Sequence, residues 1–329
     1  MSRLYPVIGP ESAFLEAGIA CLERVLSASG TPPVVLRADT LADVERGLTG
    51  SAGDVILVLS APDAALSAAL QRTATSTLRF EPGFEPAVRY VMERHDASLI
   101  TSLRHVARSY AALDALSGVA EVVHLAVPMS EEDLAHLEEA MTRFAGPHSF
   151  ADTRAEPATT LSAVATLPPV RDPVPASLSP EDAHTLAVLA HGYERMVGAA
   201  PFQLTWPTSL FLRGDRPDAP LDGPIEMTGP ARLLVYGPYL HLPPGRWEAV
   251  VGLEVAQNAS GNRAEIRIMQ DGRSIGADAV RLPVEGGLSI IVPLESVDAR
   301  LGIEVCVGIL EGAIEGQLHL ASVTLRRLS

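Results

Sequence analysis

Basic side chains are concentrated in one stretch of the sequence, residues 86–116, whose apolar positions repeat with the period of a helix. Arg104 and Arg108 lie four residues apart, so they share one face of the predicted helix. Guanidinium groups bind sulfate and phosphate through paired hydrogen bonds, and Arg89, Arg104 and Arg108 are therefore possible anion-binding residues. The alternative is a solvated helix face on which these arginines pair with nearby acidic residues.

A second candidate for anion chemistry is the segment 9–18, which follows the first predicted strand and opens a helix. Proteins with parallel sheets commonly bind phosphate at this position. The segment carries Glu11 and Glu16 but no arginine, and its glycines do not have the spacing of a nucleotide-binding loop. Because carboxylates repel phosphate, an ordinary strand-to-helix turn is favoured here.

Aromatic residues in the C-terminal part of the chain could bind a sugar. Sugar rings stack on aromatic faces while their hydroxyl groups bond to polar side chains at the edge. The candidate saccharide-binding residues are Trp206, Arg213, Asp215, Tyr236, Tyr239, Arg246 and Asn258. The alternative is that the aromatic residues fill the core, as the alternating run that begins at Trp247 indicates.

Composition excludes several classes of function. All 25 basic residues are arginine, which rules out a phosphate-binding, Schiff-base or general-base lysine. A net charge of −15 argues against binding to nucleic acid. Cys21 and Cys306 are far apart in apolar runs, which favours free buried thiols, and His184 and His191 are too widely spaced for a metal pair. We therefore predict no catalytic residues, no metal and no cofactor.

The first half of the chain alternates short apolar runs with amphipathic stretches, a pattern typical of parallel βαβ units. Strands are predicted at residues 4–9, 32–38, 54–62 and 121–128, and helices at 11–29, 61–74, 84–95, 97–116 and 130–146. We therefore expect an α/β domain at residues 1–149. A Pro-rich linker and a helix that begins after Ser179 occupy residues 150–200 and close this domain.

Residues 201–329 contain short, partly alternating apolar runs separated by Gly, Pro, Asn and Asp. This pattern predicts an antiparallel β-sandwich of the jelly-roll type. Asp271-Gly272, between two such runs, is a strong signal for a two-residue hairpin. The fold class is thus α/β plus all-β.

The N-terminal half resembles bacterial sulfotransferases and their relatives. The resemblance rests on "YPVIGPESAFLEAGIACL" and "DVILVLSAPDAALSAALQR", together with the helical segments that follow. It implies a P-loop-like α/β domain that binds a phosphoadenosine sulfate donor. However, Ser60-Ala61-Pro62-Asp63 stands where the family has basic residues, which puts donor binding in doubt and implies a degenerate domain.

The C-terminal half resembles the jelly-roll, carbohydrate-binding-like modules of bacterial polysaccharide glycosyltransferases, through "YGPYLHLPPGRWEAVVGLEV". The two resemblances imply a non-catalytic accessory protein of bacterial surface-polysaccharide or glycan biosynthesis. Its β-sandwich would bind a saccharide or a glycosyltransferase.

Two alternatives stay open. One is an active sulfotransferase or glycosyltransferase that holds its donor with arginines of the α/β domain, and the other is a structural protein that oligomerises through its sheet edges. The N-terminus lacks the pattern of a signal peptide, and no apolar run reaches the length of a membrane span. A cytoplasmic location is therefore expected.

Overall fold

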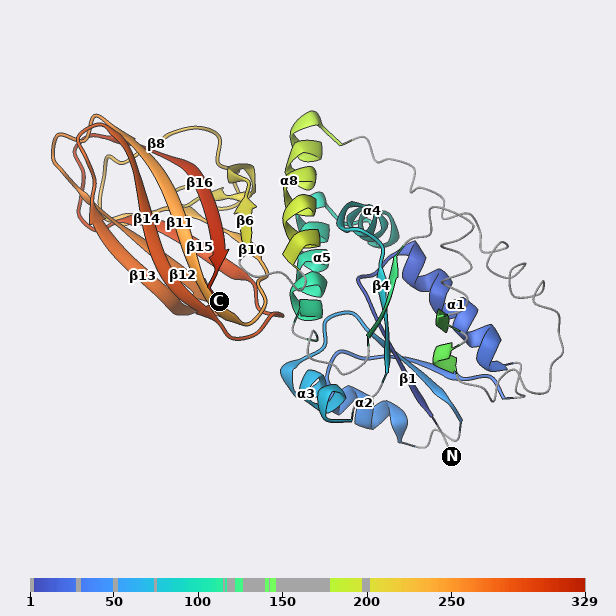
Figure 1. The fold of residues 1–329 in the computed structure, drawn as a ribbon. Helices are drawn as coiled ribbons and strands as arrows, with labels where there is room; N and C mark the ends of the chain where they lie inside the picture. Colours follow the sequence, from blue (N-terminus) through green and yellow to red (C-terminus); the bar gives the residue numbers. More distant parts are fainter. Residues whose placement is uncertain are drawn as a thin grey trace. The chain divides into compact units, whose positions relative to one another are not determined.

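The computed structural model describes most of the chain and divides it into two compact units, Met1–Ser177 and Leu178–Ser329. We call them the α/β unit and the β unit, and treat each separately (Figure 1). The described residues are 3–27, 31–49, 53–73, 76–114, 116, 122–126, 140–141, 143–145, 178–196 and 202–328. No helix among them is long and apolar enough to cross a membrane.

The α/β unit is built on a five-stranded parallel sheet with the strand order β2-β3-β1-β4-β5. Its strands are β1 (Leu4–Ile8), β2 (Val34–Arg37), β3 (Val55–Leu59), β4 (Thr77–Glu81) and β5 (Val122–Ala126). Its helices are α1 (Ala13–Ser27), α2 (Leu41–Leu48), α3 (Ala64–Thr73), α4 (Phe84–His95) and α5 (Leu99–Asp114). The strands β2 and β3 lie on one side of β1, and the strands β4 and β5 lie on the other side. The direction in which successive strands are added to the sheet therefore reverses between β1 and β4.

Helices cover both faces of this sheet, because each strand of its centre is apolar on both sides. On one face, Leu15 and Leu22 of α1 pack on β1, β3 and β4, where they form one core cluster with Phe80 of β4. On the other face, α2, α3 and α5 pack on Leu57 and Leu59 of β3. The predicted class of parallel βαβ units is therefore present in this half of the chain.

Two elements of the α/β unit were not predicted from the sequence. The strand β4 places Arg79 in a buried position, and α2 is a short helix with few apolar residues. Most of the helix predicted at residues 130–146 lies outside the described residues, where only 140–141 and 143–145 are seen to be helical. The Pro-rich segment 151–177 also lies outside the described part of the chain.

Close packing of α1 on the sheet depends on Gly18. A Cβ atom at this position would overlap Cε1 and Cζ of the Phe80 ring, which is itself fully buried against Phe14. We expect Gly18→Ala to destabilise the α/β unit by about 1–2 kcal/mol, because the ring must tilt to make room. Urea unfolding followed by circular dichroism measures this, and Ala20→Ser on the exposed side of α1 is the control. Equal stability of Gly18→Ala and the wild type would contradict the packing argument.

The β unit contains two antiparallel sheets. The six-stranded sheet has the order β13-β12-β15-β9-β7, with β10 paired to β15. Its strands are β7 (Leu212–Arg213), β9 (Arg232–Tyr236), β10 (Pro238–Leu240), β12 (Arg263–Gln270), β13 (Arg273–Arg281) and β15 (Ile303–Ile309). The five-stranded sheet has the order β14-β11-β16-β6, with β8 paired to β16. Its strands are β6 (Gln203–Trp206), β8 (Ile225–Glu226), β11 (Gly245–Ala256), β14 (Gly286–Ser296) and β16 (Gln317–Arg327).

Both sheets bury one face and expose the other. Along β11 the odd-numbered residues from Trp247 to Val255 are buried, and along β15 the same is true from Ile303 to Ile309. The predicted hairpin at Asp271-Gly272 is confirmed, since both residues have positive φ (51° and 70°) and join the paired residues Gln270 and Arg273. Alternating burial is thus the main local signal that specified this half of the chain.

The helix α8 (Pro180–Met196) packs on the β unit and belongs to it. The helix begins at the predicted N-cap residue, Ser179, whose Oγ accepts a hydrogen bond of 3.1 Å from the backbone N–H of Asp182. The Tyr193 hydroxyl donates to the His241 carbonyl at 2.8 Å, and the bare Cα of Gly192 lets Leu204 of β6 approach the helix. This helix packs against β6; that it closes the α/β domain stays a prediction from the sequence.

Candidate functional site

Two of the predicted sugar-binding residues meet on the exposed face of the six-stranded sheet. Tyr236 ends β9 and Tyr239 lies in β10, and both side chains are half-buried. Their ring centroids are 6.4 Å apart and their planes meet at 74°. The hydroxyl oxygen of Tyr236 accepts the backbone N–H of Asp218 at 3.3 Å. Two ring faces are thus held nearly at right angles to one another.

Charged groups from two other strands border these rings. The Tyr239 hydroxyl donates to Glu304 Oε1 of β15 at 2.6 Å, and burial, followed by this bond, raises the pKa of Tyr239. Arg267 of β12 lies opposite Cys306 in the strand register and contacts Glu265 at 3.2 Å. We call Tyr236, Tyr239, Glu265, Arg267 and Glu304 the tyrosine face.

The backbone of Tyr239 is strained. Its φ is 63°, a left-handed conformation that is uncommon for a bulky residue. The strain persists because the ring is tethered to Glu304 at one end, while the backbone carbonyl lies against Gly302, where a Cβ would be only 2.9 Å away. Strained residues of this kind are concentrated at ligand-binding sites, where they fix the direction of a side chain.

Trp206 and Asn258 do not present a binding surface, contrary to the expectation from sequence. Both are fully buried. The Asn258 amide donates to the carbonyl of Pro283 at 3.0 Å, and its oxygen accepts the backbone N–H of Asn262 at 3.2 Å, so it holds a loop together. Trp247 is also buried, with Nε1 donating to the Pro243 carbonyl at 3.1 Å, as the core alternative predicted.

Of the remaining predicted edge residues, Arg213 lies on β7 and Asp215 just after it, and β7 pairs with β9, the strand that ends in Tyr236. Arg213 is nearly buried and its guanidinium pairs with Asp215 at 3.1 Å, so the two satisfy each other. The Asp215 bond raises the pKa of Arg213. Arg246 is exposed, but it lies on β11 of the other sheet, opposite Glu295. The polar partner of Tyr239 is instead Glu304 of β15, and Arg267 lies on the same sheet face, on the adjacent strand β12; both are distant from Tyr239 in sequence. Only their outward positions in alternating runs could have indicated them.

In the α/β unit, the loop after β1 is occupied by a carboxylate. Glu11 Oε2 lies 2.9 Å from Nε2 of His95, at the end of α4, and 3.3 Å from Nε2 of His105 in α5. The His105 imidazole, and then that of His95, lowers the pKa of Glu11 to about 2, although burial opposes the shift. The place where parallel-sheet proteins bind phosphate therefore already holds an internal anion.

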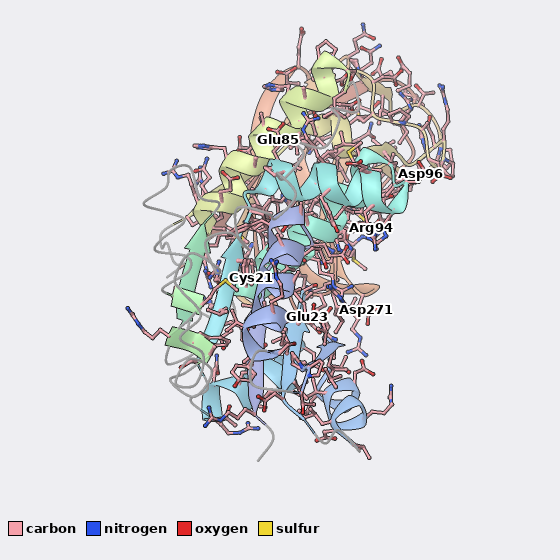
Figure 2. The ribbon with its side chains drawn as sticks, turned by 90° about the vertical axis from the view of Figure 1, so that its right-hand side faces the viewer. Cys21, Glu23, Glu85, Arg94, Asp96 and Asp271 are labelled. Atoms are coloured by element: carbon pink, nitrogen blue, oxygen red, sulfur yellow. The ribbon has the colours of Figure 1, made fainter. Side chains whose placement is uncertain are left out.

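The three predicted anion-binding arginines do not converge on one point. Arg89 pairs with Glu85 one turn earlier on α4 at 2.8 Å, and Figure 2 shows Glu85 and Asp96 at opposite ends of this helix. Arg108 lies 3.8 Å from Asp39. Asp39 in turn accepts the backbone N–H groups of Ser60 and Ala61 at 2.8 Å each. Arg104 is half-buried in α5. Helix-face pairing describes Arg89 better than anion binding does.

Within the described residues, no cluster of His, Cys, Asp and Glu could hold a metal ion. Cys21 and Cys306 are both buried, as predicted, and are not joined in a disulfide. Burial, and then the neighbouring Glu304 carboxylate, raises the pKa of the Cys306 thiol to about 12. A thiol that stays protonated at neutral pH is a poor nucleophile, so Cys306 forms part of the floor under the tyrosine face.

No protein-family model and no curated protein matches the chain. Solved structures that match in part include carbohydrate-binding modules. The xylan-binding module CBM15 is 12% identical, with 40% of this chain and 99% of that chain covered and a TM-score of 0.28. The cyclase Fisc from Fischerella sp. TAU is 8% identical, with 39% and 100% covered and a TM-score of 0.25.

Arabinose-bound MgGH51 α-L-arabinofuranosidase is 8% identical, with a TM-score of 0.23. The match covers 30% of this chain and 17% of the arabinofuranosidase, so this chain spans a small part of that enzyme. Likenesses at these scores carry no argument about function. The resemblance of the N-terminal half to sulfotransferases stays a prediction from sequence.

Proposed function

We propose that the protein binds a saccharide on the tyrosine face of its β unit, without transforming it. The observation that carries the proposal is the pair of half-buried tyrosine rings at 74°, with Glu304 bonded to the hydroxyl of Tyr239 and Arg267 on the same sheet face. A pyranose can stack on one ring while its edge contacts the other. The carboxylate and the guanidinium then bond to its hydroxyl groups, since a carboxylate has about four acceptor positions and Tyr239 uses one.

The rigidity of this face supports binding. Tyr236 is held by the Asp218 backbone and Tyr239 by Glu304, so both rings are oriented before a ligand arrives. Preorganised aromatic groups lose little conformational entropy on binding, and this raises affinity. We therefore favour the β unit, in the manner of a sandwich-type binding module, as the part of the protein that recognises its ligand.

The transferase alternative is less well supported. Of the arginines that could hold a donor in this alternative, Arg89 is paired with Glu85 and Arg108 lies 3.8 Å from Asp39. A role in surface-polysaccharide biosynthesis, a glycosyltransferase partner and a cytoplasmic location are proposals that rest on the sequence alone. The oligomeric alternative has no specific observation in its favour.

Affinity electrophoresis in gels that contain xylan, β-1,4-galactan, cellulose ether or dextran tests the proposal, with titration calorimetry on the corresponding oligosaccharides. We expect at least one polysaccharide to retard the full chain. Tyr239→Ala should then lower the association constant at least about tenfold, because a central aromatic contact contributes about 2 kcal/mol or more. Tyr239→Phe keeps the ring and should keep most of the affinity.

Tyr90→Ala is the matched control, because Tyr90 is a half-buried tyrosine of the α/β unit. It should bind as the wild type does. Intrinsic fluorescence verifies that the β unit of the Tyr236 and Tyr239 variants is folded, since both tryptophans lie there, and far-ultraviolet circular dichroism verifies the fold of Tyr90→Ala. Full binding by Tyr239→Ala and Tyr236→Ala, or the absence of retardation by every polysaccharide, would refute the proposed site.

A further inference from the structure

A groove of about 640 Å³ runs beside α8 on the β unit, away from the residues of the tyrosine face. It is lined by one side of α8 and by β6 with the residue before it. The lining residues are His184, Ala187, Val188, His191, Gly192, Arg195, Phe202, Gln203 and Thr205. This volume is within the range of sites for small molecules, about 300–1,000 Å³.

The charge of the groove is opposite to that of the chain. The protein carries a net charge of −15, yet none of the described residues that line the groove is acidic. Three of them, His184, His191 and Arg195, are basic and follow one another at helical spacing along one side of α8. A guanidinium in a groove without acidic side chains attracts anions, although the chain as a whole is acidic.

The contact between two of these residues shows which groups are available. Arg195 Nη1 lies 3.1 Å from His191 Nε2. Because a guanidinium only donates, Nε2 of His191 accepts, and the proton of this neutral imidazole is on Nδ1. Arg195 is exposed and lines the groove, and this contact uses one of the five N–H donors of its guanidinium.

The other wall gives the groove room for more than a simple ion. Gln203 and Thr205 of β6 point outward, because they alternate with the buried Leu204 and Trp206. Their amide and hydroxyl groups can bond to hydroxyl groups of a ligand. Val188 of α8 and Phe202, which precedes β6, supply apolar surface to the groove.

We propose that this groove is a second ligand site, which binds a sugar-sized molecule bearing a carboxylate or phosphate group. Arg195 bonds to the anionic group in a fork, with His191 holding the guanidinium in place and His184 adding a donor. Gln203 and Thr205 bond to the uncharged part of the ligand. This site is separate from the tyrosine face and does not depend on saccharide binding there.

Titration calorimetry of the full chain with glucuronate, glucose 6-phosphate, inorganic phosphate and glucose tests this proposal. We expect one or both of the sugar anions to bind at least about tenfold more tightly than glucose and inorganic phosphate. The two sugar anions distinguish a carboxylate ligand from a phosphate ligand. Arg195→Gln should weaken binding of the sugar anion at least tenfold, whereas Tyr239→Ala should leave it unchanged.

A second pair of variants protects the test against loss of folding. Ala187→Glu places an acid in the groove at an exposed position of α8, and should abolish binding of the sugar anion. Ala183→Glu adds the same charge at an exposed position of α8 that does not line the groove, and should bind as the wild type does. Equal affinity for glucose and both sugar anions, no binding of either anion, or unchanged binding by Ala187→Glu would overturn the proposal.

Discussion

Replacing Trp247 with alanine is expected to destabilise the β unit by about 3–5 kcal/mol, the range found for large aromatic residues in cores. The side chain is fully buried, its ring packs edge-on against Phe202 at 6.3 Å, and Arg327 lies over it. The substitution also removes the donor to the Pro243 carbonyl, which is left without that bond. Since a whole domain is stable by only about 5–15 kcal/mol, this is a severe loss.

Chemical unfolding followed by the fluorescence of the remaining Trp206 measures the effect, because Trp206 lies in the same unit. Arg246→Ala, at the exposed neighbouring position, is the control and should change the free energy of unfolding by less than about 0.5 kcal/mol. A change below about 1 kcal/mol for Trp247→Ala would mean that this ring does not fill the core.

Glu11→Gln is expected to destabilise the α/β unit by about 1–3 kcal/mol near neutral pH. In the folded chain the pKa of Glu11 is lowered from 4.5 to about 2, chiefly by His105 and His95. A lowered folded-state pKa stabilises the fold above the unfolded-state value, and this contribution is lost as the pH falls from about 4.5 toward about 2. The expected destabilisation is set below the free energy that the full pKa shift would give, because the Glu11 side chain is 26% exposed and solvent screens its charge.

The difference in free energy of unfolding between the wild type and Glu11→Gln should therefore shrink as the pH is lowered from about 6 to about 3. Far-ultraviolet circular dichroism is the suitable probe, because α1 to α5 all lie in the α/β unit, whereas both tryptophans lie in the β unit. Glu16→Gln is the matched control, since Glu16 forms an exposed pair with Arg37. A difference that stays constant with pH would show that Glu11 is not held as an anion.

Much of the β unit could be predicted from the sequence alone, because its strands have one buried and one exposed face. In β11, from Trp247 to Val255, apolar residues alternate in the sequence as buried residues do in the structure. The dipeptide Asp271-Gly272 identifies the turn between β12 and β13. The α/β unit was predicted less completely. β4 is hard to predict because Arg79 interrupts its apolar run. In the interior this arginine pairs with Glu81, and Tyr110 and Asp114 also interact with its charge.

The candidate sites were predictable only in part. Tyr236 and Tyr239 are close in sequence and were recognised together, but Trp206 was assigned to the surface although it is buried. The residue type determines which bonds a side chain can form, but it does not determine whether the side chain faces the core or the solvent. Direction is set by strand pairing, since a shift by one residue moves a side chain to the other face of a sheet.

The class of each half, the start of α8, the hairpin turn and the absence of lysine chemistry can be predicted from the sequence. The tertiary structure is needed to show that Glu304 bonds to Tyr239 and that two histidines contact Glu11. It also decided that α8 lies beside β6 to form a groove. Local patterns depend on residues two to four positions apart, whereas these sites join residues separated by tens of positions, which only sheet order and helix packing bring together.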